Sequence, residues 1–349
     1  MDATRVSVVG ATGYTGAELL RLIAGHPRLE LAAIVGHSTI GQPVAEALPS
    51  VTGTLSARIE AFDASAVASR SDAVFCALPH GASAAVVREL RALGTVVLDL
   101  SADFRLADPE VHREWYGDHA APELVSQAVY GLVELHREAL RTADLIAVPG
   151  CFPTASILAL APLVREGLVA IDSIVIDAKT GVSGAGRAPK LEAHLPEIGE
   201  GIRAYKVAGL HRHTPEIEQE LGRLAGQSVR VTFTPHLIPI TRGVLATAYA
   251  VATPSSLGAE RCAEAARALY DGSPAVSVLP VGTDPDTLWV RGANRALLSY
   301  AVDARTGRVV AQCAIDNLVK GAAGQAVQCL NVRFGFDEAE GLRAPAVWP

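Results

Sequence analysis

The N-terminal segment constrains the fold more than any other part of the chain, because a short apolar run leads through a glycine-rich turn into a helix pattern. Arg5–Val9 is rich in β-branched residues, Gly10–Gly16 contains three glycines, and an amphipathic helix pattern follows to about Gly25. A strand, a glycine turn and a helix in this order are typical of a dinucleotide-binding βαβ unit. The spacing is GxxGxxG and not GxGxxG, so an ordinary strand-to-helix turn remains the alternative.

The glycine turn is the candidate phosphate-binding element. A pyrophosphate needs close approach of the backbone, and it binds to the N–H groups and the positive dipole end of a helix N-terminus. The hydroxyl groups of Thr12 and Thr15 add further donors. The candidate cofactor-binding residues of this turn are Gly10, Thr12, Gly13, Tyr14, Thr15 and Gly16.

The end of the second predicted strand, Leu29–Val35, indicates which dinucleotide binds. An acidic residue at this point would accept a hydrogen bond from the ribose 2′-OH and repel a 2′-phosphate. The chain instead continues with Gly36, His37, Ser38 and Thr39, none of which is a carboxylate. We therefore expect NADP, with His37 and Ser38 as candidate ligands of its 2′-phosphate. The alternative is that both residues belong to a plain polar turn.

Strands and helices alternate through the first 148 residues, and this alternation predicts a doubly wound parallel sheet. After residue 149 the pattern changes to long alternating strands with few helices, which predicts an α+β domain with a large mixed or antiparallel sheet. We expect an α/β protein in which residues 1–148 form a Rossmann-type NADP-binding domain and residues 149–315 form a catalytic and oligomerisation domain. The strands expected in the second domain are Ile174–Lys179, Val229–His236, Val244–Val251, Ala296–Asp303 and Arg308–Ile315.

Charge and composition limit the partners of the chain. Its 349 residues include 30 Lys and Arg against 37 Asp and Glu, which gives a formal net charge of −7. An acidic balance without a basic run argues against nucleic acid and anionic membranes as partners. The longest apolar stretches fall short of the ~20 residues that span a bilayer, and the N-terminus has no signal-peptide pattern. We expect a soluble, cytoplasmic protein.

One of the five cysteines, Cys151, differs from the others in its position. An odd number of cysteines without a CxxC pair predicts neither a disulfide framework nor a metal site. Cys151 follows Pro149 and Gly150 at a point where a helix should begin. A helix N-terminus stabilises a thiolate, so Cys151 is the candidate nucleophile; a buried helix start without chemistry is the alternative. The cysteines expected only to pack in the core are Cys76, Cys262, Cys313 and Cys329.

Chemistry between a thiolate and a nicotinamide needs a proton donor, and the most suggestive candidates are His211 and His213. They flank Arg212 just before a predicted helix, with Thr214 expected at its N-cap and Pro215 at its first position. A single histidine is more often structural than catalytic, but two in one short run at a loop end favour a functional role. The weaker rivals, which also follow predicted strands, are His80 and His236.

These segments together resemble the N-acetyl-γ-glutamyl-phosphate reductases, which are relatives of the aspartate-semialdehyde dehydrogenases. The resemblance covers nearly the whole chain, and Pro149–Ala155 (PGCFPTA) is its most specific part. One small departure is Val133, where the family commonly has proline. The other segments that carry the resemblance are Gly10–Gly16, Ser101–Leu106, Tyr130–Leu135, His211–Glu220 and Asp316–Ala326.

The resemblance implies NADPH-dependent reductive dephosphorylation of N-acetyl-γ-glutamyl phosphate to N-acetylglutamate γ-semialdehyde, a step of arginine biosynthesis. It implies that the Cys151 thiolate attacks the acyl phosphate and that hydride from NADPH reduces the resulting thioester. His211 is then the acid/base residue, with His213 as its substitute, and an imidazolium near Cys151 would stabilise the thiolate. It also implies that the C-terminal helix, around residues 316–349, completes the NADP-binding domain and that Asn317 contacts the nicotinamide.

Cationic side chains are the candidates for binding the anionic groups of the substrate. A planar guanidinium binds phosphate oxygens in a bidentate way, so Arg105 is a candidate ligand of the substrate phosphate. A surface salt bridge from Arg105 to Asp103 or Asp108 is an equally weighted alternative. The further candidates for catalysis or substrate binding are Ser101, Lys179 and Arg187.

Three other functions agree with parts of the sequence. Extended short-chain dehydrogenases share the glycine turn but need Tyr-x-x-x-Lys, and no lysine lies four residues after Tyr116, Tyr130 or Tyr205. A carrier-protein-linked aminoadipyl-phosphate reductase of lysine biosynthesis would favour a basic surface, which the net charge of −7 does not suggest. A non-catalytic NADP-binding redox sensor would leave the histidine segment without a role.

The apolar sheet face and the resemblance predict a homodimer or homotetramer.

Overall fold

The computed structural model describes residues 3–37 and 39–348, and the chain forms two compact units. The first unit comprises the chain up to Pro149 together with residues 322–344, and the second comprises residues 150–321 and 345–349. The chain thus leaves the first unit just before Gly150. It returns to the first unit at Ala322. None of the described helices is long and apolar enough to cross a membrane.

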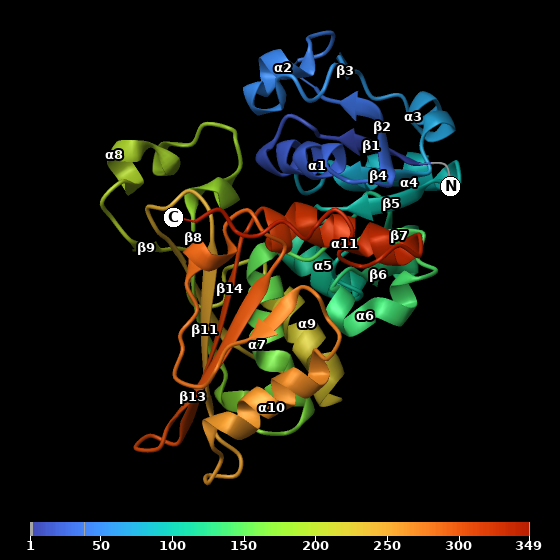
Figure 1. Cartoon of the computed structure of the whole chain (residues 1–349). Coiled ribbons are helices and arrows are strands. Elements are labelled where there is room, and N and C mark those ends of the chain that lie inside the picture. The colour runs from blue at the N-terminus through green and yellow to red at the C-terminus, as the bar shows by residue number, and fades with distance from the viewer. Residues whose placement is uncertain (1–2, 38, 349) are drawn as a thin grey trace. The chain divides into compact units, whose positions relative to one another are not determined.

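The first unit is built on a parallel sheet. Its strands are β1 (Thr4–Val9), β2 (Leu29–Val35), β3 (Ile59–Glu60), β4 (Ala73–Cys76), β5 (Val96–Asp99), β6 (Ala128–Tyr130) and β7 (Leu145–Ala147). Its helices are α1 (Tyr14–Ala24), α2 (Val44–Ala47), α3 (Ala64–Arg70), α4 (Ser83–Ala92), α5 (Pro109–Tyr116), α6 (Val133–Leu140) and α11 (Gly324–Arg333). The strands lie in the order β3-β2-β1-β4-β5-β7-β6, and every neighbouring pair is parallel (Figure 1). The doubly wound sheet predicted from the sequence is confirmed.

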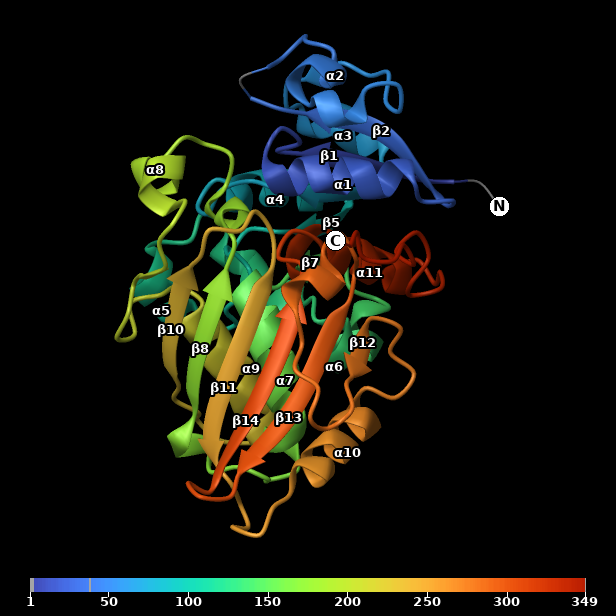
Figure 2. The ribbon, with the colours of Figure 1, turned by 60° about the vertical axis from the view of Figure 1, so that its left-hand side comes forward.

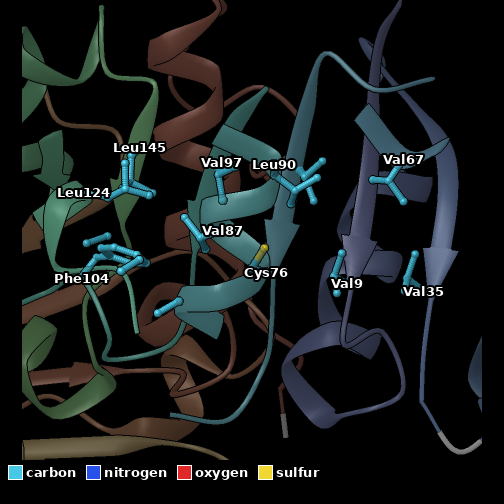
Figure 3. Packing of buried hydrophobic residues seen from close by; sticks show 14 of the residues in the cluster. Val9, Val35, Val67, Cys76, Val87, Leu90, Val97, Phe104, Leu124 and Leu145 are labelled. Carbon is cyan, nitrogen blue, oxygen red and sulfur yellow. The ribbon is translucent and has the colours of Figure 1, made fainter. Parts of the chain in front are cut away.

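Side chains on the two faces of this sheet fill two apolar layers. Val9 and Cys76 belong to one buried cluster, in which Val67 of α3 and Val87 of α4 pack against the strands (Figure 3). Because side chains alternate along a strand, Val8 faces the other side, and it is fully buried there. Such burial on both faces explains why these strands read as continuous apolar runs in the sequence.

Helix α11 is integrated into the first unit although it lies near the C-terminus of the chain. The side-chain amide of Gln325 donates to the carbonyl oxygen of Gly131 at 2.7 Å, and the Cys329 thiol donates to the same oxygen at 3.0 Å. Farther along the helix, Asn331 Oδ1 lies 3.0 Å from Nε2 of His26. These contacts fix the returning segment to two separate parts of the unit.

The second unit contains a mixed sheet. Its strands are β8 (Val175–Thr180), β9 (Arg203–Ala204), β10 (Thr232–Leu237), β11 (Val244–Val251), β12 (Val276–Val278), β13 (Ala296–Asp303) and β14 (Arg308–Ile315). Its α-helices are α7 (Cys151–Arg165), α8 (Leu195–Ile198), α9 (Thr214–Ala225) and α10 (Ala259–Leu269). The strand order is β12-β13-β14-β11-β8-β10-β9, in which β8 and β10 are parallel and β11 is antiparallel to both of its neighbours. The predicted large mixed sheet is confirmed.

Helix α7 lies against one face of the mixed sheet and forms the centre of the second unit (Figure 2). Every residue from Phe152 to Val164 is buried, as expected for a helix that is apolar on all sides. Strand β11 presents the small buried side chains Ala246 and Ala248 on its covered face, and α7 contacts this strand. The packing therefore fixes the position of the first residue of α7, Cys151.

Two helix starts differ from the sequence-based expectations. Helix α9 begins at Thr214, so His213 occupies the N-cap and Pro215 the second helical position. The C-terminal helix expected around residues 316–349 begins only at Gly324, because the chain first forms a π-helical turn, η7 (Val319–Ala323). Proline fits either of the first two positions, since their N–H groups have no intrahelical acceptor. Sequence periodicity alone does not distinguish these registers.

Candidate active site

The candidate nucleophile Cys151 is the first residue of α7. Gly150 forms the N-cap in an extended conformation (φ −70°, ψ 155°), and Pro153 lies in the first turn. Cys151 is partly buried, whereas the other four cysteines are fully buried, and all five are free thiols. Burial raises the pKa of the Cys76 thiol and raises that of Cys262 to about 11, so these two remain protonated at neutral pH. Cys151 alone combines access with a helix N-terminus.

A buried carboxylate holds the chain beside this thiol. Oε1 of Glu216 accepts a hydrogen bond of 2.8 Å from the backbone N–H of Gly150, and the Glu216 side chain is fully buried. Glu216 lies in the first turn of α9, so the bond joins the starts of two packed helices. No sequence pattern points to Glu216, because a glutamate in an amphipathic helix is normally solvated.

The two candidate histidines lie in an aromatic cluster around Phe152, the residue that follows the thiol. The ring centroids of His211 and His213 lie 5.6 and 6.0 Å from that of Phe152, and the two imidazoles are 4.8 Å apart. Phe233 and Tyr205 pack edge-on against His211 at 5.3 and 5.5 Å. The structure therefore brings together the thiol segment and both histidines, as the sequence predicts.

His211 is neutral in this environment. Burial, with a further contribution from the Lys206 charge, lowers the pKa of His211 to about 4. Its Nδ1 accepts a 3.1 Å hydrogen bond from the backbone N–H of His213, so the ring proton lies on Nε2. The imidazolium expected to stabilise the thiolate is thus not the favoured form of His211.

Tyr205 is a second residue near the thiol to which no sequence pattern points. Burial and the nearby Cys151 raise the pKa of the Tyr205 phenol, which places this ring within electrostatic reach of the thiol. The backbone around it is unusual: the next residue, Lys206, has φ +46°, and Ala208 has φ +55°. Left-handed conformations of non-glycine residues often mark functional segments. The sequence carries no signal for them at these positions.

Lys179 and His236 lie on the sheet face opposite to α7. The Lys179 ammonium forms a 2.6 Å ion pair with Asp177, and Nδ1 of His236 lies 3.2 Å from the same carboxylate. Alternation along β8 puts Asp177 and Lys179 on one face and the buried Ile176 and Ala178 on the face that α7 covers. The structure therefore does not bring Lys179 to Cys151. The remaining cationic candidate, Arg187, is exposed.

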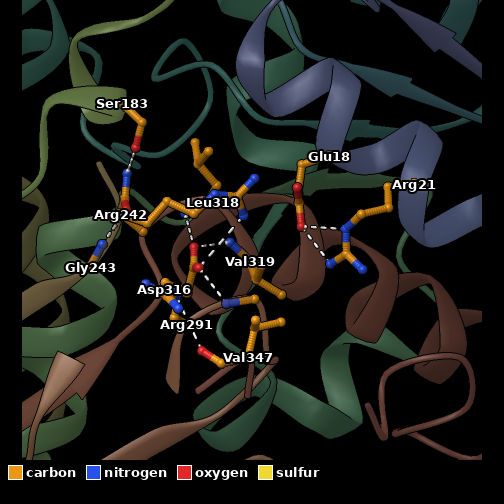
Figure 4. A network of polar contacts seen from close by, with 12 residues as sticks. Glu18, Arg21, Ser183, Arg242, Gly243, Arg291, Asp316, Leu318, Val319 and Val347 are labelled. Carbon is orange, nitrogen blue, oxygen red and sulfur yellow. Dashed lines mark hydrogen bonds and ion pairs between the residues drawn. The ribbon is translucent and has the colours of Figure 1, made fainter. Parts of the chain in front are cut away.

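Asn317 connects two loops of the second unit. Its Oδ1 accepts a 2.8 Å hydrogen bond from the backbone N–H of Gly243, and its Nδ2 donates to Oγ of Ser183 at 2.9 Å (Figure 4). The side chain is almost fully buried. These contacts give Asn317 a structural role, and the expected contact with the nicotinamide stays a prediction.

In the first unit, Arg105 binds backbone oxygens. Its Nε donates to the carbonyl of Val148 at 2.7 Å, its Nη2 donates to that of Leu100 at 2.8 Å, and the side chain is only 6% exposed. The guanidinium is therefore buried and not on the surface, and these carbonyls are two of its partners. Val148 lies three residues before Cys151, so Arg105 anchors the strand end that leads to the thiol segment.

Ser101 belongs to a buried carboxylate network at the end of β5. Its hydroxyl donates to Asp99 at 2.6 Å and accepts from the backbone N–H of Asp103 at 3.0 Å. Ser83 donates to the same Asp99 carboxylate at 2.5 Å, and burial raises the pKa of Asp99 to about 6. Ser101 thus orders the loop after the strand, where ligands of doubly wound sheets bind.

The glycine turn has the geometry that a pyrophosphate requires. Gly10 has φ +84°, and a Cβ on it would collide with the carbonyl of Ala77. A Cβ on Gly16 would lie 2.6 Å from Cα of Ala11. Gly13 is the N-cap of α1 and has no side chain with which to cap it, so this residue leaves the first N–H groups of the helix available to another acceptor. These features fit a dinucleotide.

The remaining cofactor candidates differ in how far the structure describes them. Thr12 and Thr15 are partly buried in the turn, and Tyr14 is 42% exposed at the start of α1. His37 is exposed just after β2, whereas Ser38 lies outside the described residues. The assignment of a 2′-phosphate site to His37 and Ser38 stays a prediction.

Comparison with known proteins agrees with the division of the chain into two units. Residues 5–143 match the NAD binding domain of semialdehyde dehydrogenases, and residues 151–317 match their dimerisation domain. The N-acetyl-gamma-glutamyl-phosphate reductase of Pelotomaculum thermopropionicum is 50% identical over 99% of this chain and 100% of its own length. The chain belongs to the N-acetyl-γ-glutamyl-phosphate reductase family. The family member from Synechocystis is 47% identical, over 100% of this chain and 99% of its own.

Solved structures show the same fold at much lower identity. The aspartate semialdehyde dehydrogenase II of Vibrio cholerae, complexed with ASA, superimposes with a TM-score of 0.74 at 17% identity. The match covers 96% of this chain and 99% of the other. An NADP complex of the Candida albicans aspartate semialdehyde dehydrogenase gives a TM-score of 0.71 at 15% identity, over 95% and 98% of the two chains. The semialdehyde dehydrogenase fold expected from the resemblance is confirmed.

Proposed function

We propose that this chain reduces N-acetyl-γ-glutamyl phosphate to N-acetylglutamate γ-semialdehyde, with NADPH as the reductant and Cys151 as the nucleophile. Full-length similarity to reductases with this name supports the substrate and the reaction. The observation that carries the chemistry is the place of Cys151, at the N-terminus of α7 and directly before Phe152, whose ring contacts His211. A thiol so placed, next to a buried histidine, fits acyl transfer.

In the first step the Cys151 thiolate attacks the acyl carbon, and the C–O bond to phosphate breaks with its electron pair leaving on the phosphate. A thioester on Cys151 results. The dipole and N–H groups at the start of α7 stabilise the thiolate and the oxygen anion that forms on the acyl carbon. The thioester is a better electrophile for reduction than a free carboxylate would be.

His211 acts on the oxygen of the reacting carbonyl. Since its Nδ1 accepts the His213 N–H, its Nε2–H is the group left to donate, and a neutral imidazole can polarise a carbonyl by such a hydrogen bond. Anionic substrate nearby would raise the pKa of His211 from about 4 and allow it to transfer a proton. His213 is the substitute for this role, because its ring lies in the same cluster.

The first unit is proposed to hold the cofactor through its glycine turn. Gly10, Gly13 and Gly16 let the backbone approach the pyrophosphate, and Thr12 and Thr15 add hydroxyl donors. The exposed ring of Tyr14 and the polar residues His37 and Ser38 are assigned to the adenosine end. Bound NADPH supplies hydride chemistry, the reducing equivalent that the overall reaction needs.

We also propose that the chain works as a homodimer or homotetramer in the cytoplasm. The match of residues 151–317 to a dimerisation domain supports self-association. Five free cysteines and no disulfide among the described residues agree with a reducing compartment. The proposed substrate-binding candidates remain Arg105, Ser101, Lys179 and Arg187. Lys179 is less favoured than Arg105 and Ser101, because its side chain faces away from α7.

The test is the reverse reaction. Purified protein given N-acetylglutamate γ-semialdehyde, inorganic phosphate and NADP⁺ should produce NADPH only when phosphate is present. Cys151→Ala should abolish this turnover, and the matched control Cys262→Ala, at a buried cysteine of α10, should keep it. Near-normal turnover by Cys151→Ala would contradict the thioester mechanism, and phosphate-independent turnover would contradict the assigned reaction.

A further inference from the structure

A glycine of the second unit packs directly against the candidate nucleophile. A Cβ placed on Gly321 would lie 2.8 Å from Cβ of Cys151 and 3.2 Å from its Cα. Such an approach is too close for two real Cβ atoms, so any side chain at position 321 would displace one of the two segments. The atoms in contact belong to the backbone and Cβ of Cys151, which cannot rotate away as a flexible side chain would.

The position of Gly321 is set by a π-helical turn. Gly321 lies in the middle of η7 (Val319–Ala323), and its N–H donates to the carbonyl of Asp316, five residues earlier, at 2.9 Å. Turns of this kind are rare and often occur at functional sites. Position 321 lies elsewhere in this wider turn than it would in a regular α-helix. In this chain the turn places Gly321 against Cys151.

Asp316 fixes the start of this turn. Its Oδ1 accepts hydrogen bonds from the backbone N–H groups of Leu318 and Val319, at 2.8 and 3.1 Å. Its Oδ2 accepts from the N–H of Gly292 at 2.7 Å and lies 3.6 Å from the Arg242 guanidinium (Figure 4). The carboxylate is fully buried, so these bonds are made without competition from water.

We propose that Gly321 is a positioning residue for the Cys151 thiol and that Asp316 holds the π-helical turn in which Gly321 lies. The proposal rests on the nucleophilic role assigned to Cys151 above. The absence of a side chain at position 321 lets the turn close onto the first residue of α7 and keeps Cys151 at the helix N-terminus. A displacement of about 1 Å in a reacting group can cost on the order of 10²-fold in rate.

The test compares Gly321→Ala with Gly258→Ala. Gly258 is the N-cap of α10, and a Cβ there meets no atom of the described chain within 4 Å. The first readout is the rate at which iodoacetamide alkylates Cys151, followed by mass spectrometry as a function of pH. Gly321→Ala should raise the midpoint of this profile by at least about half a pH unit, because the displaced thiolate loses dipole stabilisation. Gly258→Ala should match the wild type.

The second readout is steady-state kinetics. Gly321→Ala should lower kcat at least about tenfold while KM for NADPH stays within about twofold, since the change affects the thiol and not the cofactor turn. A folded Gly321→Ala with a wild-type alkylation profile would overturn the proposal. Alkylation does not depend on the assigned substrate, so the proposal can fail or hold independently of the proposed function.

Asp316→Asn covers the case in which Gly321→Ala does not fold. Asparagine has nearly the same volume and keeps one acceptor oxygen. It loses the charge toward Arg242 and one of the two oxygens that accept the N–H groups of Gly292, Leu318 and Val319. We expect the alkylation midpoint to move in the same direction by a smaller amount. An unchanged midpoint in a folded Asp316→Asn would show that the carboxylate does not position the turn.

Discussion

The carboxylate of Glu216 accepts a 2.8 Å hydrogen bond from the backbone N–H of Gly150, the residue directly before the candidate nucleophile. Gly150 is the N-cap of α7, and Glu216 lies in the first turn of α9, so one buried bond joins the starts of two helices. Cys151 is bonded directly to Gly150, so a fixed Gly150 limits where the thiol can lie. The placement of the thiol therefore depends on an anchor 65 positions away in the sequence.

Removing this anchor should destabilise the protein. Glu216→Ala leaves the Gly150 N–H buried without its acceptor, which costs about 1–3 kcal/mol in the free energy of unfolding. Glu216→Gln keeps an acceptor oxygen and should lose less. Urea unfolding at neutral pH measures both, with the wild type alongside. If Glu216→Ala unfolds at the wild-type urea concentration, the bond does not anchor the start of α7.

His211→Asn should damage turnover more than His213→Asn. His211 is the buried imidazole, and loss of a general acid/base group typically costs about 10²–10⁴-fold in kcat. His213→Asn retains the backbone N–H that fixes the His211 ring, so its effect should be smaller. Steady-state rates of the phosphate-dependent reaction decide between them. A larger loss in His213→Asn would mean that the two roles must be exchanged.

The low pKa of His211 predicts acid sensitivity. The group has a pKa of about 4 in the folded chain and about 6.5 when unfolded, so the unfolded state binds more protons between these values. The contribution of His211 to the free energy of unfolding is fully present above pH ~6.5. It is lost as the pH falls toward 4, by up to about 3 kcal/mol. The measurement is urea unfolding at a series of pH values, for the wild type and for His211→Gln.

Asp99 titrates in the same pH range with the opposite sign, because burial raises its pKa to about 6. Both proteins carry Asp99, so the difference between wild type and His211→Gln isolates the histidine. The variant should lose less stability than the wild type between pH 7 and 4.5. Parallel losses in the two proteins would show that His211 is not held neutral by burial.

Gly16→Ala should weaken cofactor binding, because its Cβ would press on the backbone of Ala11 and open the glycine turn. Gly25→Ala is the matched control, since it follows the same helix and its Cβ would make only ordinary contacts, 3.8 Å from the nearest atom. Fluorescence titration with NADPH should give at least about a tenfold higher Kd for Gly16→Ala, a loss of ~1.4 kcal/mol. Equal Kd values for the two variants would remove the turn from the cofactor site.

The sequence is most informative where a pattern reports local burial. Val244–Val251, Ala296–Asp303 and Arg308–Ile315 were predicted with the bounds that β11, β13 and β14 have. Such strands can be recognised from the sequence, because apolar and polar side chains alternate where only one face of the sheet is covered. The two-residue strands β3 and β9 are too short to carry a period, and they form because a neighbouring strand offers its edge.

Local sequence patterns predict the class of sheet, the glycine turn and the candidate thiol, because each depends on residues close together in the chain. The surroundings of the thiol come from packing between distant segments, which buries Glu216, keeps His211 neutral and brings Gly321 close. In the folded chain, Lys179 lies on the face of the sheet opposite to α7, and Arg105 donates to backbone oxygens. Burial and packing between distant segments set these properties, and no local pattern encodes them.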